Sequence, residues 1–271
     1  MDFLKNILRI MDMDMPRPEP YGWFHILFII LSIGAAVLLC LTHKKDDRDR
    51  VRRIVLITAI TVVILEIYKQ INYSFSYSGE SIEFDYQWYA FPFQFCSMPM
   101  YIGLLAGIIK KGKVHDALCA FLATYSIFAG ICVMVYPNDV FIGTIGINIQ
   151  TMICHGSMVT IGAYLLYSGH VKLEHKTILG ATFVFSVCVG CAAIMNEIAY
   201  YSGLLESDTF NMFFISPHCE GTLPVYSWVQ QIVPFPLCLI IYIAAFSAAS
   251  YIILLVSMGI KKLALNARKK A

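Results

Sequence analysis

The stretch YGWFHILFIILSIGAAVLLCLT, residues 21–42, contains no acidic side chain, no lysine and no arginine. A helix needs roughly 20 apolar residues, at a rise of about 1.5 Å each, to cross a hydrocarbon layer about 30 Å thick. This stretch meets that length, and a strongly charged segment follows it directly. It therefore predicts a transmembrane helix rather than a core helix of a soluble domain.

Similar windows recur along the whole chain of 271 residues. Hydrophobic residues make up 58% of the sequence, charged residues only 14%, and the mean hydropathy is +0.68. This composition excludes an ordinary soluble domain. We predict an all-α, polytopic integral membrane protein with about seven transmembrane helices. The windows run over Tyr21–Thr42, Val51–Tyr73, Phe91–Ile109, Val114–Tyr136, Gly143–Tyr167, Lys176–Tyr201 and Val229–Ile260.

The chain divides into a membrane domain and two short terminal segments. Residues 21–260 form the predicted seven-helix domain, and residues 261–271 form a basic cytoplasmic tail. Prolines at positions 234 and 236 are expected to kink or restart the last helix. Residues 1–20 are predicted to lie on the membrane surface, because apolar side chains recur there at helical spacing. These side chains are Phe3, Leu4, Ile7, Leu8 and Met11.

The distribution of charge predicts the orientation. The segments after the first, third, fifth and seventh windows hold six, three, two and five Lys or Arg residues, whereas the alternate segments hold none. Basic loops stay in the cytoplasm. We therefore expect the carboxyl terminus inside and the amino terminus outside, in a bacterial cell membrane. The formal net charge of +2 suggests no role in nucleic-acid binding.

Nine cysteines are present, and eight of them fall within predicted helices. Most are expected to be small packing residues, and Cys219 has no obvious disulfide partner. Cys188 and Cys191 have the spacing of half a zinc site, but no second ligand pair accompanies them. We predict no metal and no cofactor.

Polar side chains within the windows gather toward the predicted outer side. Such groups are costly in hydrocarbon, usually face the bundle interior and therefore indicate a site. Glu66 and Lys69 are three residues apart and share a helix face. A buried ion-pair network that also includes Glu197 is an equally simple interpretation, and interhelical hydrogen bonding is the simpler one for several amides. The full set is Glu66, Lys69, Gln94, Cys96, Asn148, Gln150, His155, Asn196 and Glu197.

Four short motifs resemble those of the YwaF-type family of integral membrane proteins. They are an acidic and a basic residue one turn apart (Glu66 and Lys69), a Pro-x-x-x-Cys segment (Pro92 to Cys96), a His-Gly pair (His155 and Gly156), and an asparagine before an aromatic external loop (Asn196). The family includes a vertebrate transmembrane acyltransferase implicated in ether phospholipid synthesis. Many bacterial relatives carry a histidine where this chain has Gln94.

The resemblance implies a cysteine-histidine acyltransferase or transacylase that acts on membrane phospholipids. Cys96 would be the nucleophile and His155 the general base and then acid. Gln94, Asn148 or Asn196 would stabilise the oxyanion. Glu66, Lys69 or Glu197 would orient the histidine or bind a headgroup phosphate. Hydrolysis would result if water resolved the acyl-enzyme first.

The sequence leaves other functional interpretations open. In straight, upright helices Cys96 and His155 would differ in depth by roughly 10 Å. The main alternative is a proton-coupled or small-solute transporter, or a ligand-binding membrane protein, that uses Glu66, Lys69, Glu197 and His155. A receptor-like sensor is a weaker third possibility, because helix number does not determine function.

Overall fold

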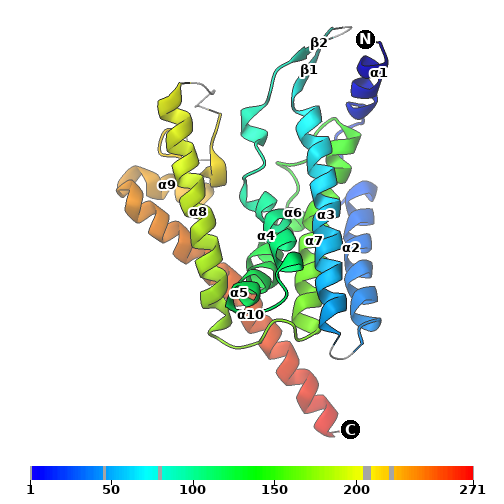
Figure 1. The fold of residues 1–271 in the computed structure, drawn as a ribbon, viewed down its shortest axis with the longest axis vertical. Coiled ribbons are helices and arrows are strands. Elements are labelled where there is room, and N and C mark those ends of the chain that lie inside the picture. Colours follow the sequence, from blue (N-terminus) through cyan, green and yellow to red (C-terminus); the bar gives the residue numbers. More distant parts are fainter. Residues whose placement is uncertain (1, 45–46, 79–80, 204–208, 220–222, 271) are drawn as a thin grey trace.

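The computed structural model describes residues 2–44, 47–78, 81–203, 209–219 and 223–270 (Figure 1). Within these residues six helices are long and apolar enough to cross a membrane. The all-α, multi-pass architecture predicted from hydropathy is confirmed. The six are α2 (Trp23–Leu41), α3 (Arg48–Asn72), the continuous helix Lys113–Val135, α7 (Ile145–Tyr167), α8 (Thr177–Ser202) and α10 (Phe235–Lys270).

The continuous helix Lys113–Val135 contains a local change of winding. It consists of α5 (Lys113–Phe121), a π-helical turn η3 (Leu122–Ser126) and α6 (Ile127–Val135). In an 18-residue window of this helix 72% of the residues are buried, and in α7 67% are buried, whereas the share is at most 22% in α2, α3, α8 and α10. The first two are therefore central, and the exposed apolar faces of the others are suited to lipid contact.

The predicted helix over residues 91–109 is present only in part. Residues 95–97 form a 3-10 turn, η2 (Phe95–Ser97), and the α-helix α4 runs over Met98–Ile108, only 11 residues. That length spans about 16 Å, roughly half of a hydrocarbon layer. Pro92 lacks an N–H and disfavours helix in the residue before it, so the segment ahead of Cys96 stays extended.

Two further elements lie at the end of the molecule that holds the amino terminus (Figure 1). The first is α1 (Asp2–Met11), a helix within the amino-terminal segment. The second is an antiparallel hairpin of β1 (Phe75–Ser78) and β2 (Ser81–Phe84), followed by the 3-10 turn η1 (Trp88–Ala90). The Tyr68 hydroxyl of α3 donates to the Met11 carbonyl at 2.5 Å and so holds the end of α1 against the bundle.

The last predicted window, Val229–Ile260, is divided near Pro234 and Pro236, where a kink or restart was predicted. A short helix α9 (Pro224–Ile232) ends before Pro234, and α10 begins at Phe235. The α10 helix then continues without a break to Lys270, so the predicted basic tail is an extension of this helix. In Figure 1 it projects beyond the other helices toward the carboxyl terminus.

The core is built around an aromatic cluster shared by four elements. Phe185 of α8 stacks with Tyr125 of η3 at a centroid distance of 4.6 Å and contacts Phe95 and Phe246. Phe213 of the loop between α8 and α9 joins the same cluster, with a side chain that is 0% exposed. The loop between α8 and α9 thus packs its Phe213 side chain into the protein interior.

Candidate functional site

Cys96 reaches the middle of the bundle on non-helical backbone. Gln94 has extended φ and ψ angles of −83° and 162°, and Cys96 follows in turn η2, just before α4. Figure 1 shows this segment running from the hairpin into the bundle between α8 and α3. Irregular backbone at membrane depth is tolerated where protein surrounds it or a cavity adjoins it.

Cys96 and Cys154 of α7 line one small cavity. The cavity has a volume of about 30 Å³ and is otherwise lined mainly by apolar residues of α3, α4, η3 and α7. Cys154 directly precedes His155 in α7. Cys96, the expected nucleophile, therefore lies close to the turn of α7 that carries His155, the expected base. His155 itself is not among the residues that line this cavity.

His155 is held in one tautomer. Its Nδ1 atom lies 2.8 Å from the Thr151 carbonyl oxygen, which can only accept, so Nδ1 carries the hydrogen. In the neutral imidazole the lone pair is then on Nε2. The side chain is 6% exposed. Among the described residues no hydrogen bond joins His155 to Cys96.

Glu66 is the centre of a buried polar network between α3 and α7. One carboxylate oxygen lies 2.7 Å from Lys69 Nζ and accepts a 2.7 Å hydrogen bond from Gln70. The other accepts from Gln150 Nε2 at 3.4 Å. The same amide nitrogen lies 3.4 Å from Cys154 Sγ at the cavity wall. The predicted Glu66 and Lys69 pair is therefore present and is connected to the cavity.

The network also fixes the segment that carries Cys96. Gln70 donates from Nε2 to the Ala90 carbonyl at 2.8 Å and accepts at Oε1 from Tyr86 at 2.5 Å. Electrostatic interactions extend from Lys69 to both Cys96 and His155. Lys69 is thus the charged group that these two residues share.

Gln94 and Asn196 both hold the loop that packs into the core. Gln94 donates to the Asn211 carbonyl at 3.0 Å and accepts from the Phe213 N–H at 2.8 Å. Asn196 donates to the Met212 carbonyl at 3.0 Å and accepts from the Met212 N–H at 2.7 Å. Phe213 has a φ of 59°, which is costly for a bulky residue, and these four bonds compensate for that strain.

The polar partners of Asn148 and Glu197 do not include Cys96. Asn148 bonds the Ile142 N–H at 3.0 Å and the Ile142 carbonyl at 2.8 Å, which shapes the entry to α7. Glu197 lies 3.2 Å from His218 Nε2. Among the described residues no ion pair joins Glu197 to Lys69, and no hydrogen bond joins it to Glu66 or Lys69, so the three do not form one network.

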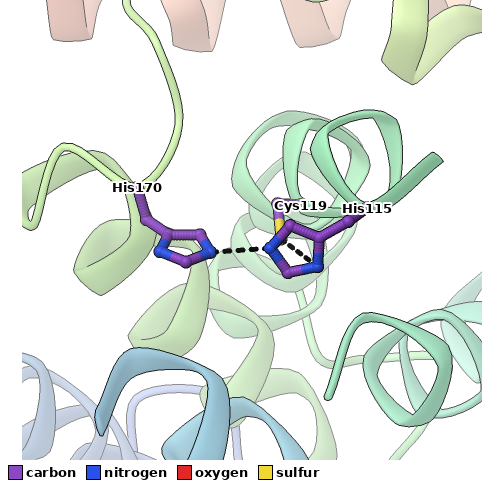
Figure 2. Close-up of side chains that lie close together, drawn as sticks. All are labelled: His115, Cys119 and His170. Carbon is purple, nitrogen blue, oxygen red and sulfur yellow. Dashed lines mark hydrogen bonds between the residues drawn. The ribbon is translucent and has the colours of Figure 1, made fainter. Parts of the chain in front are cut away.

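A second cluster, which the sequence interpretation missed, lies where α5 begins. His115 Nε2 is 2.9 Å from His170 Nε2 and 3.6 Å from Cys119 Sγ, and Figure 2 shows the three side chains converging. All three candidate ligand atoms lie within 4.8 Å of one another. Burial, together with His115 and Arg48, lowers the pKa of His170 to about 4, so that imidazole is neutral at neutral pH.

The HDALC sequence of residues 115–119 was the available signal, because a histidine and a cysteine four apart share one helix face. The third member, His170, lies in the connection between α7 and α8, which no local pattern relates to α5. By contrast, Cys188 and Cys191 belong to no such group among the residues that the structure describes.

These features define a class, an all-α integral membrane protein with a polar network and a small cavity lined by two cysteines. Within that class the sequence matches the TMEM164 family over residues 20–254, and the chain belongs to this family. No match is found among curated proteins or among solved structures.

Proposed function

We propose that this protein is a phospholipid acyltransferase or transacylase in which Cys96 is the nucleophile and His155 the base. The observation that carries the proposal is the cavity that Cys96 and Cys154 share: Cys96 lines it from turn η2, and α7 contributes Cys154, the residue next to His155.

The tautomer of His155 suits the proposed role. With hydrogen on Nδ1, the Nε2 lone pair can take the thiol proton. The sulfur then attacks the ester carbonyl carbon of a phospholipid, the bond to the alcohol oxygen breaks, and the lysophospholipid leaves with the proton from His155. A second lysophospholipid hydroxyl attacks the acyl-cysteine, His155 takes its proton, and the thiol is restored as the new ester forms.

The polar residues around the site divide into two roles in this proposal. Gln94, Asn148 and Asn196 support the surrounding backbone, because their amides are already bonded to main-chain groups. Lys69 is the group for the substrate phosphate or the developing oxyanion, and Glu66 holds it in place at 2.7 Å.

The cavity volume of about 30 Å³ accommodates water but not an acyl chain. Substrate entry therefore requires the walls to move. Cys96 is the cavity residue that is carried by a 3-10 turn rather than by a long helix, so this turn is the element proposed to shift.

Detection of an acyl-cysteine tests the proposal. Purified protein incubated with a phospholipid labelled in its acyl chain should acquire a hydroxylamine-sensitive label on Cys96. Cys96→Ser should abolish the thioester, and Cys154→Ser, the matched control in the same cavity, should retain it. Unchanged thioester labelling in Cys96→Ser, or no labelling of the wild-type protein by any phospholipid class, contradicts the proposal.

The transporter alternative would use Glu66, Lys69, Glu197 and His155 together. The pairing of Glu197 with His218 rather than with Glu66 and Lys69 argues for acyl transfer as the leading proposal. Proton-coupled uptake that is lost in Glu197→Gln and unaffected by Cys96→Ser would reverse that order.

A further inference from the structure

The three side chains His115, Cys119 and His170 form the strongest cluster of metal-ligating groups outside the proposed active site (Figure 2). His115 and Cys119 are 4% and 1% exposed. They occupy successive turns of α5, and the loop after α7 brings His170 to them. The Nε2 atoms of the two imidazoles lie 2.9 Å apart and share a hydrogen bond. Metal binding would move that hydrogen to an Nδ1 atom and so free both Nε2 lone pairs.

We infer that His115, Cys119 and His170 bind a divalent zinc ion. Imidazole nitrogen and cysteine sulfur are ligands that Zn²⁺ prefers. This inference does not depend on the proposed acyltransferase activity, because none of the three residues lines the Cys96 cavity.

The distances between the ligand atoms suit that ion. Zinc bonds of about 2.0–2.1 Å to nitrogen and 2.3 Å to sulfur place two tetrahedral nitrogens about 3.3 Å apart, and nitrogen and sulfur about 3.6 Å apart. The observed separation of Cys119 Sγ from His115 Nε2 is 3.6 Å, and the two nitrogens are 2.9 Å apart. The third separation, from His170 to Cys119 Sγ, is at most 4.8 Å. Metal binding would therefore move the His170 ring away from His115 and by up to about 1.2 Å toward Cys119.

The surrounding charges balance. Arg48 and Asp116 both interact electrostatically with Cys119 and His170, so a positive and a negative side chain flank the cluster. On binding, the sulfur–zinc bond forms and the Cys119 thiol releases its proton to solvent. Three protein ligands leave a fourth position for water, as in zinc sites that are not purely structural.

A consequence of this site is a link between the α7–α8 connection and α5. His170 Nδ1 is buried and has no hydrogen-bond partner within the described part of the chain, so the imidazole ring is not held through that atom. Zinc would attach the loop to the start of α5 and raise the stability of the fold by binding only the native state.

Metal titration of the full chain in detergent, without a histidine tag, tests the inference. After chelator treatment, the protein should bind one Zn²⁺ or Co²⁺ per chain, and the Co²⁺ form should show a thiolate charge-transfer absorption. Cys119→Ser should lose that absorption, whereas Cys132→Ser, a control in the same continuous helix, should keep it. His170→Asn should weaken binding at least about tenfold.

His170→Asn also covers the case in which Cys119→Ser does not fold, because His170 lies in a loop and is only partly buried. Zinc should raise the unfolding temperature of the wild-type protein more than that of His170→Asn. The inference is overturned if the wild-type protein binds no stoichiometric ion, or if His170→Asn binds it as tightly.

Discussion

Lys69 Nζ lies 2.7 Å from a Glu66 carboxylate oxygen, and their side chains are only 16% and 9% exposed. Replacing only one residue of such a pair is costly, because the remaining charge stays buried without its partner. The Glu66 carboxylate also accepts bonds from Gln70 and Gln150, so its loss removes a hydrogen bond between α3 and α7.

Glu66→Gln and Lys69→Met should each lower the free energy of unfolding by about 3–5 kcal/mol. The free energy of unfolding of the double variant should fall by less than the sum of the two single losses, because neither charge is then buried without a partner. Unfolding in mixed detergent measures all three. Strictly additive losses would show that the two side chains do not interact in the folded protein.

His155 offers a direct test of the proposed base. His155→Gln removes the lone pair on Nε2 and should slow acyl-cysteine formation by about 10²–10⁴-fold, the usual contribution of a general base. Added imidazole should restore part of the rate in His155→Ala. His175→Gln, at an exposed histidine in the α7–α8 connection, should leave the rate unchanged. Equal rates in His155→Gln and wild type would exclude His155 as the base.

Hydropathy predicted the long helices because lipid exposure requires a continuous apolar stretch. It overestimated the helix around Cys96, since phenylalanine and methionine keep the window hydrophobic where Pro92 prevents a regular start. Glu66 and Lys69 could be paired from their spacing alone. The contacts of Gln94 and Asn196 could not be predicted, because they depend on a loop that returns into the core from more than a hundred residues after Gln94.

Asn196 is predicted to act through the loop around Phe213. Asn196→Ala leaves the N–H and the carbonyl of Met212 without their partners, and each buried unpaired group costs about 1–3 kcal/mol. We expect faster proteolysis between α8 and α9 and reduced stability. Asn196→Asp keeps the acceptor and should show a smaller loss.

Asn266→Ala, at an exposed position in α10, is the matched control and should have no effect. Proteolysis of Asn196→Ala at the wild-type rate would mean that Gln94 alone holds the loop. The double variant with Gln94→Ala would then be needed to release it, and it should be cleaved faster than either single variant.

Gly130 determines how closely α6 approaches the backbone of His155. A Cβ atom at this position would lie 2.7 Å from the His155 carbonyl oxygen, closer than atoms of this kind pack. Gly130→Ala should therefore push α6 from α7, lower the free energy of unfolding by about 1–3 kcal/mol and reduce acyl transfer by displacing His155. Gly190→Ala in α8, where nothing lies within 4 Å of the new Cβ atom, should change neither property. Stability that falls while the rate per folded molecule stays constant would show that His155 keeps its position when α6 moves.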